Sequence, residues 1–191
     1  MRMFLLILIL IFSLQSWTKA DDIRDFEIEG MSIGDSILSN IKKEKINKIK
    51  SINKKLKIVR TRLNNNLKIY DYVQLFWFEY DNDYKIVGIS GELLFDNDLD
   101  GCKKKQKEIA DSIKKTIKNF NVRQSVNSYN EDLSGKSKVY HYAFNFENGD
   151  NLNVQCYMFS KEFEDKNNMI DNLKVMIVTK EMDDHFREAW K

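Results

Sequence analysis

Residues 140–158 read YHYAFNFENGDNLNVQCYM, two runs of alternating apolar and polar side chains on either side of Asn148-Gly149. Such alternation is typical of two β-strands that each bury one face. A two-residue turn at Asn148-Gly149 would set the two apolar faces against each other, because a slip of one residue turns every side chain to the opposite face. A three-residue loop over 147–149, with Gly149 in the left-handed conformation, instead brings the apolar faces together. The predicted pairs are Phe144 with Leu152, Tyr142 with Val154, and Tyr140 with Cys156.

The rest of the chain supplies further strands and helices around this hairpin. Residues 70–80 and 84–95 are rich in aromatic and β-branched side chains and are separated by the turn residues Asp81-Asn82-Asp83. A helix is predicted over 100–120, and a last strand over 173–179 precedes a short C-terminal helix. The order is helix, three strands, helix, three strands, helix, which places the chain in the α+β class. We predict an antiparallel sheet of about six strands with helices packed on one face.

The first twenty residues have the features of a secretory signal peptide. A short basic region precedes an apolar run over 4–14, which is shorter than the roughly 20 residues of a membrane-spanning helix. Thr18 and Ala20 place small residues at the −3 and −1 positions, so cleavage is predicted after Ala20, with an uncleaved anchor as the alternative. We therefore divide the chain into a signal peptide, residues 1–20, and a single α+β domain, residues 21–191. The mature protein is expected to be exported, either periplasmic or secreted.

Positive charge is concentrated in one segment. The formal net charge of the chain is +2, yet residues 41–68 hold eleven lysines and arginines against the single acidic residue Glu44. Apolar residues recur there first at helical spacing and then alternate, so the basic segment 41–63 is predicted to form a helix, a linker and a first strand. Such a segment suits an anionic lipid surface. The alternative is that the lysines only reflect the composition of the whole chain, which is rich in Lys, Asn and Ile and has no Pro. The candidate lipid- or anion-binding residues are Lys42, Lys43, Lys45, Lys48 and Lys50.

Two cysteines are present, Cys102 and Cys156. Cysteines of an exported chain pair more often than not, so we predict a disulfide that fixes the start of the long helix to the strand beneath it. Two buried thiols are the alternative. A reactive thiolate would need a basic neighbour, and in the predicted register His141 points to the face opposite Cys156.

A calcium-loop pattern occurs before the long helix. The run Asp96-Asn97-Asp98-Leu99-Asp100-Gly101 matches the first six positions of a calcium-binding loop, which makes Asp96, Asp98 and Asp100 candidate metal ligands. Position twelve is Lys107 where a bidentate Glu belongs, and a strand rather than a helix leads in. The alternative is a polar turn in which Asp100 caps the helix. Calcium is therefore a weak candidate, and no other cofactor is expected.

Four stretches of the chain resemble a family of uncharacterised small secreted bacterial proteins. They are GMSIGDSIL (30–38), YKIVGISGELLFDND (84–98), SGKSKVYHYAFNFENGDNLNVQCY (134–157) and DNLKVMIVTKEM (171–182). The resemblance covers most of the mature chain and implies one domain with an export signal. The family has no established activity, so the resemblance assigns no site residue.

No spacing of residues marks a catalytic site. The chain has only two histidines, and its many carboxylates form no recognisable acid and base pair, so we assign no catalytic residue. We expect an exported, non-catalytic binding or structural protein of the bacterial envelope, which presents its sheet or an edge strand to another macromolecule. The alternatives are a peripheral protein of anionic lipid surfaces and an enzyme of unknown class. The expected partner is an unknown envelope protein or anionic lipid; nucleic acid is not expected, because no aromatic residues are interleaved with the lysines.

Overall fold

The computed structural model describes residues 22–53 and 55–189, so the predicted signal peptide lies outside the described residues. The side chains of 47–53 are likewise not described. The strands are β1 (Lys50–Asn53), β2 (Ile58–Leu63), β3 (Tyr72–Phe78), β4 (Gly88–Leu94), β5 (Phe120–Ser128), β6 (Lys138–Phe146), β7 (Asn151–Met158) and β8 (Asn172–Val178). The helices are η1 (Ile23–Asp25), η2 (Ile37–Ser39), α2 (Lys43–Ile49), α3 (Leu99–Thr116), α4 (Lys161–Asn167) and α5 (Lys180–Ala189).

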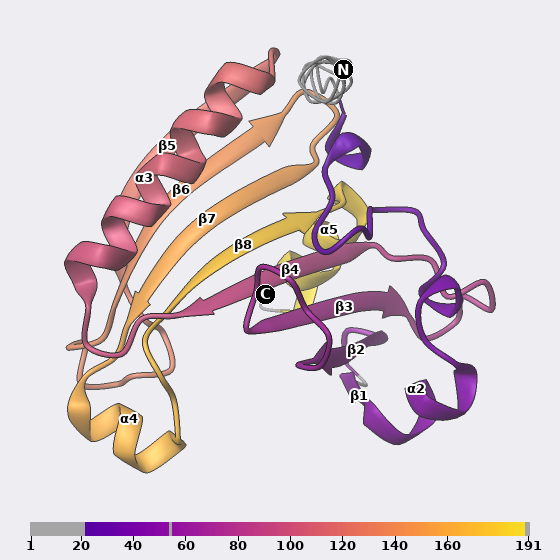
Figure 1. Ribbon diagram of the computed structural model, residues 1–191, viewed down its shortest axis with the longest axis horizontal. Helices are drawn as coiled ribbons and strands as arrows, with labels where there is room; N and C mark the ends of the chain where they lie inside the picture. Colours follow the sequence, from indigo (N-terminus) through magenta and orange to yellow (C-terminus); the bar gives the residue numbers. More distant parts are fainter. Residues whose placement is uncertain (1–21, 54, 190–191) are drawn as a thin grey trace, which may run out of the picture.

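All eight strands form one antiparallel sheet in the order β1-β2-β3-β4-β8-β7-β6-β5 (Figure 1). Each half of the chain is a four-stranded meander, and the two meanders join where β4 pairs with β8. Helix α3 makes the one long crossing, from the central strand β4 to the edge strand β5 (Figure 1). The predicted α+β class is confirmed, with eight strands instead of about six. The two additional strands, β1 and β5, are the edges of the sheet.

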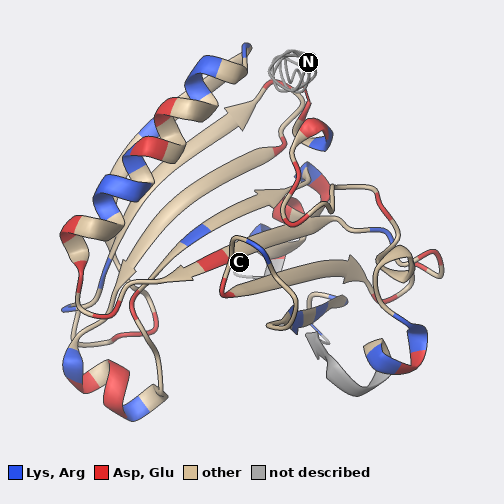
Figure 2. Ribbon diagram, viewed as in Figure 1, with Lys and Arg blue, Asp and Glu red and all other residues tan. Residues whose placement is uncertain are grey.

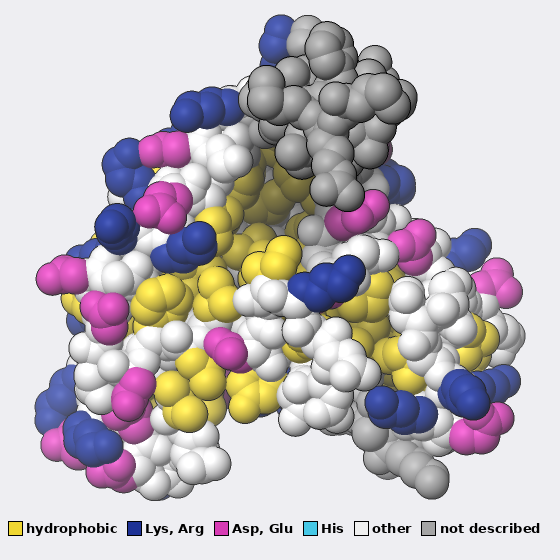
Figure 3. All heavy atoms as spheres, viewed as in Figure 1, with side chains coloured by type: hydrophobic (Ala, Val, Ile, Leu, Met, Phe, Trp, Pro, Cys, Tyr) yellow, Lys and Arg dark blue, Asp and Glu magenta, His cyan; other side chains and the backbone are white. Residues whose placement is uncertain are grey.

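The larger part of the core lies on the face of the sheet that α3 covers, which we call the inner face. Side chains of alternate strand residues, such as Leu75 on β3, Val154 on β7 and Val175 on β8, pack there against α3 and the segment that leads into the sheet. The visible surface of α3 is mostly charged, and apolar side chains gather in the hollow beside it (Figure 3). The intervening strand residues point to the other side, which we call the outer face.

Helix α5 packs on the outer face, so the helices do not all lie on one side. Met182 is fully buried there against Phe76 on β3 and Val178 on β8. Gly88 on β4 allows this close approach, because a Cβ atom at that position would overlap the Met182 sulfur. Figure 1 shows α5 behind the sheet, at the end of β8. The reason is local: β8 ends with its outward-facing residues apolar, and the helix that follows covers them.

The predicted hairpin register is confirmed. Phe144 pairs with Leu152, Tyr142 with Val154, and Tyr140 with Cys156. The loop has three residues, since the Phe146 amide donates to the Asp150 carbonyl at 3.0 Å, and Gly149 has φ +90°. Gly149 is required there because positive φ strains residues that carry a Cβ atom.

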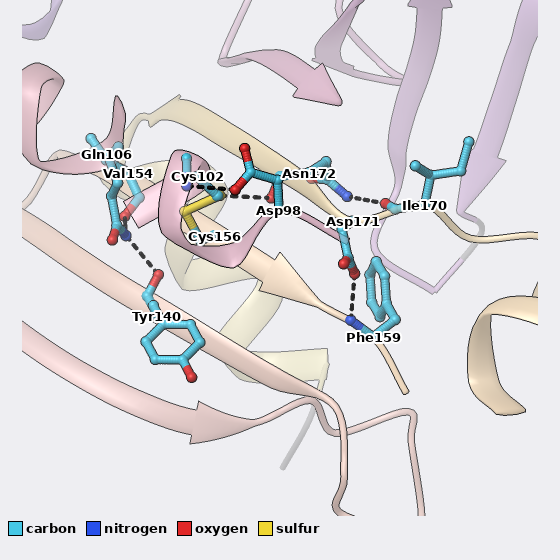
Figure 4. The surroundings of a disulfide bond; sticks show 11 residues. Asp98, Cys102, Gln106, Tyr140, Val154, Cys156, Phe159, Ile170, Asp171 and Asn172 are labelled. Atoms are coloured by element: carbon cyan, nitrogen blue, oxygen red, sulfur yellow. Dashed lines mark hydrogen bonds between the residues drawn. A yellow bond between two sulfur atoms is a disulfide. The ribbon is translucent and has the colours of Figure 1, made fainter. Parts of the chain in front are cut away.

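The predicted disulfide is also present and joins Cys102 on α3 to Cys156 on β7, with 6.0 Å between the Cα atoms. Both cysteines are fully buried. One turn further along α3, the Gln106 amide donates to the carbonyls of Tyr140 (2.7 Å) and Val154 (2.8 Å), as Figure 4 shows. The long helix is thus fixed to β6 and β7 by one covalent bond and two hydrogen bonds.

The basic segment 41–63 forms the helix α2 and the first long strand β2, as predicted, but the edge strand β1 takes the place of the linker. No helix among the described residues is long and apolar enough to span a membrane.

Candidate binding groove on the outer face of the sheet

The outer face is covered by α5 near β3 and β4 and is open over β5, β6 and β7. An open groove of about 820 Å³ lies along this uncovered part. Most of its lining side chains are polar and uncharged. They are Arg123, Ser125, Asn127, His141, Ala143, Asn145, Asn151, Asn153, Gln155, Tyr157, Met176, Val178, Asp183, Phe186 and Arg187.

Strand alternation puts these side chains on one face. On β7, the core residues Leu152, Val154 and Cys156 point inward, so Asn153 and Gln155 between them point into the groove. The cross-strand register then aligns neighbouring strands, with Ser125 on β5 opposite His141 on β6, and His141 opposite Gln155 on β7. The result is a row of polar side chains that runs across three strands.

One polar contact inside the groove holds an imidazole in place. The Nε2 atom of His141 lies 2.8 Å from the Asn153 side-chain oxygen, so that nitrogen donates in the tautomer that satisfies both groups. This confirms the prediction that His141 points away from Cys156. Ser125 is the hydroxyl nearest in register to His141, but its oxygen accepts a hydrogen bond from the Asn127 amide at 3.1 Å. The described residues therefore contain no hydrogen bond from Ser125 to His141 that would mark a nucleophile and its base.

Helix α5 forms one wall of the groove. The Arg187 Nε atom donates to the Asp183 carboxylate at 2.8 Å, and the Asn151 amide lies 3.5 Å from the same carboxylate. Arg123 on the edge strand β5 is exposed and forms no ion pair within the described part of the chain. The groove therefore carries a small positive charge, and it comes from the β5 side.

Beside the groove, a charged network closes the centre of the outer face. Glu92 on β4 is buried, and its carboxylate accepts hydrogen bonds from Arg62 (2.9 Å) and Gln74 (2.6 Å) and lies 3.0 Å from the Lys174 ammonium. Lys174 also lies 5.4 Å from the centre of the Tyr157 ring, at the margin of the groove. Burial raises the pKa of Tyr157, which stays a neutral phenol. These charges are satisfied by one another, so they belong to the fold rather than to a ligand site.

The loop after β5 borders a second pocket, which shares Asn127, His141, Gln155 and Tyr157 with the groove. One carboxylate holds this loop. Asp132 accepts hydrogen bonds from the hydroxyls of Ser134 (2.6 Å) and Ser160 (3.2 Å) and from the amide of Ser137 (2.9 Å). The hydrogen bonds from the Ser134 and Ser137 side chains hold the pKa of Asp132 well below its usual range. The loop presents Leu133 almost fully exposed, at 98%. Its conformation is thus fixed from within while its apolar tip faces solvent.

Comparison of the chain with protein-family models, with curated proteins and with solved structures gives no significant match. The resemblance to a family of secreted bacterial proteins therefore stays a prediction. The functional argument rests on the geometry of this chain alone.

The candidate lysines lie at the opposite end of the sheet from the groove. Lys42, Lys43 and Lys45 are exposed on or next to α2, and the Lys43 ammonium lies 5.3 Å from the Tyr84 ring. The side chains of Lys48 and Lys50 lie outside the described residues. Figure 2 shows basic residues, all of them lysines, on α2 with the acidic Glu44 among them, and strands β5–β8 nearly free of charge.

The calcium-loop pattern folds as a helix start. Asp98 is the N-cap of α3, and its carboxylate accepts the Gly101 amide at 2.8 Å, whereas Asp100 lies in the first turn and is not the cap. The Asp96 carboxylate accepts the Asn97 amide at 2.8 Å. Among the residues with described positions, no group of three His, Cys, Asp or Glu side chains is arranged to hold a metal ion. The geometry gives the proposal of calcium binding no support.

Sequence reasoning did not find the groove. Four of its five Asn and Gln residues lie within 140–158, where they form the solvent-facing half of an alternating pattern. The residues from β5 and α5 reach the groove through pairings and packing that span the whole chain, which no local pattern reveals.

Proposed function

We propose that the protein is an exported, non-catalytic binding protein of the bacterial envelope, which holds a partner protein against the groove on its outer face. The observation that carries this proposal is the composition of the groove. The chain has 31 lysines and arginines, yet no lysine lines the groove. Three of the fifteen lining residues, Arg123, Asp183 and Arg187, carry a formal charge.

This composition resembles a protein interface more than an ordinary surface. The cores of protein interfaces are poor in Lys, Glu and Asp and rich in Arg, Tyr and Phe. The groove combines Arg123, Tyr157 and Phe186 with several Asn and Gln side chains. Their amide groups carry both hydrogen-bond donors and acceptors. An open antiparallel sheet face, bordered by α5 on one side only, suits a broad protein surface better than a small ligand.

Binding also accounts for the groove better than catalysis does. An active site is expected to hold titratable groups whose pKa values are shifted for their task. The carboxylates with raised pKa values, Glu164 and Asp171, owe the shift first to burial and lie at α4 and the start of β8, outside the groove lining. Tyr157 lines the groove, and its raised pKa is likewise caused first by burial. Together with the Ser125 hydroxyl, which accepts from Asn127, this favours recognition over acid–base chemistry.

Two features support export. The disulfide is typical of oxidising compartments outside the cytosol, and the first twenty residues have the pattern of a signal peptide. An envelope partner would meet the groove in that compartment.

Site-specific photo-crosslinking tests the proposal. A photoreactive residue replaces Asn145, which is exposed in the groove, and the matched control replaces Lys104, which is exposed on α3 on the opposite side of the sheet. In cells that export the protein, we expect one discrete crosslinked partner from position 145 and none from position 104. Equal crosslinking from both positions, or none from 145, would contradict the proposal.

A second candidate function is attachment to anionic lipid, favoured by the exposure of three lysines at α2. Each lysine near an anionic surface contributes about 1 kcal/mol. Binding to anionic vesicles that weakens with salt, and is lost when Lys42, Lys43 and Lys45 are replaced by Ala, is the expected result of co-sedimentation. The matched control replaces three lysines of α3, Lys103, Lys104 and Lys105. Equal loss in both variants would point to net charge rather than to a site.

A further inference from the structure

We propose that β5 pairs with β5 of a second copy of this chain, which joins two sheets into one across a twofold axis. The proposal goes beyond the proposed function and bears on it in one respect: the pairing makes the groove continuous between two copies. Its starting point is the difference between the two edges of the sheet. The edge β1 has four residues and begins with Lys50, whereas β5 has nine residues and one charged side chain, Arg123.

Long edge strands that carry no feature to prevent pairing with another strand are unusual in monomeric proteins. Edge strands are commonly blunted by short length, by lysines, by proline or by bulges, because unpaired backbone groups recruit other strands. Strand β5 has none of these: it pairs with β6 over all nine residues without interruption, from Phe120 with Phe146 to Ser128 with Lys138. No strand lies on its outer side in the described part of the chain. This edge is therefore prepared for another strand.

The direction of the backbone groups on β5 follows from the ladder. The Tyr129 amide donates to the Ser137 carbonyl at 2.9 Å, which continues the β5–β6 register. In an antiparallel pair, residues alternate between those that bond to the neighbour and those that point away. Odd-numbered residues of β5 therefore bond to β6, and the amides and carbonyls of Val122, Gln124 and Val126 point outward.

A twofold axis at Gln124 gives a self-complementary register. It places Gln124 opposite Gln124 of the other copy and Val122 opposite Val126 of the other copy. The twofold symmetry repeats this contact, so two valine pairs form. Val122 is 46% exposed and Val126 is 58% exposed, and both lie on the inner face. An axis one residue earlier, at Arg123, would place two arginines opposite each other, which is unfavourable. An axis at Ser125 would leave Val122 opposite a serine.

The same register extends the groove. On the outer face, Arg123 of one copy lies opposite Ser125 of the other, and all of these residues line a groove. The amide-rich surface then runs without a break from β7 of one copy, across both β5 strands, to β7 of the other. A symmetric partner, or a long one, would contact both copies.

Sedimentation velocity of the purified protein, expressed with its full sequence so that any N-terminal processing takes place, tests the pairing. We expect a dimer that dissociates on dilution. Gln124→Pro removes an outward amide at an edge position where proline is tolerated, and should weaken the dimer at least tenfold. Gln124→Thr keeps the outward backbone amide and should leave the dimer intact. A monomer at every concentration, an assembly larger than a dimer, or a dimer unaffected by Gln124→Pro would overturn the proposal.

Paired charges test the register. In the proposed register, the double variant V122E/V126K places Glu opposite Lys twice and should remain dimeric, whereas V122K/V126K places Lys opposite Lys and should be monomeric. An axis at residue 122 or at residue 126 would instead place like charges together in the first variant. Monomeric V122E/V126K would therefore overturn the register. A monomeric protein that still crosslinks a partner from position 145 would contradict the dimer and leave the proposed function intact. A dimer that crosslinks no partner would contradict the proposed function and leave the dimer intact.

Discussion

Breaking the Cys102–Cys156 disulfide should lower the free energy of unfolding by about 4 kcal/mol. The two cysteines are 54 residues apart in the sequence. In the chain-entropy model, closing a loop of that length lowers the entropy of the unfolded chain by about 14 cal/mol/K, which corresponds to about 4 kcal/mol at 25 °C. The folded side changes little on reduction, because both sulfurs stay fully buried between α3 and β7. The effect is therefore expected in the unfolded state.

Urea unfolding of the oxidised and the reduced protein measures this difference without a change of sequence. Reduction should lower the midpoint and raise the m-value, because the unfolded chain without the bond exposes more surface. The C102A/C156A variant is the control: reductant should leave its unfolding curve unchanged. A loss below about 1 kcal/mol on reduction would refute the reasoning, since the bond would then constrain little of the unfolded chain.

Three further predictions concern carboxylates of the fold. Glu92→Gln should lower the free energy of unfolding in urea by about 1–3 kcal/mol, because it leaves two cations without their buried partner. The control Glu162→Gln, at an exposed ion pair, should lower it by less than about 1 kcal/mol. Equal losses would contradict the role of burial. The pKa of Asp132 is lower in the folded protein than in the unfolded chain, so its stabilising effect is present above the ordinary Asp pKa and is lost as pH falls through it toward the folded value. In Asp132→Asn, the melting temperature should decrease less steeply below about pH 4 than in the unaltered protein. An unchanged decrease of the melting temperature at acid pH would count against the role of the hydrogen-bonded carboxylate. Asp98→Ala should cost about 1 kcal/mol through loss of the helix cap, and calcium should leave the melting temperature of the unaltered protein unchanged; a calcium-dependent rise would revive the metal site.

The parts of the fold predicted from the sequence are those in which burial leaves one choice. Phe144 and Leu152 alternate with polar residues on strands joined by a glycine loop, and only one register buries both. The same register fixed the direction of His141. In both cases, a wrong choice would have exposed a whole apolar face. The disulfide was predicted on a different ground, the presence of two cysteines in a chain with an export signal.

The missed parts are those in which little is buried or the contacts are remote. Strand β5 alternates only weakly. Phe120, Val122 and Val126 share the inner face with the polar Gln124 and Ser128, and both valines stay exposed at the edge, so the pattern did not mark this segment as a strand. The position of α5 depends on Phe76, far back in the sequence, and on the absence of a side chain at Gly88. The groove inherits both features, because its two sides are β5 and α5.

The central claim, that the groove holds a partner protein, is tested most directly by the affinity for the partner crosslinked at position 145. Asn145→Lys adds one charge to the lysine-free groove, and Ser112→Lys adds the same charge to the exposed side of α3. The account predicts that the Kd rises about tenfold or more for Asn145→Lys, which is about 1.4 kcal/mol, and stays within about twofold for Ser112→Lys. Equal affinities for the two variants would contradict it.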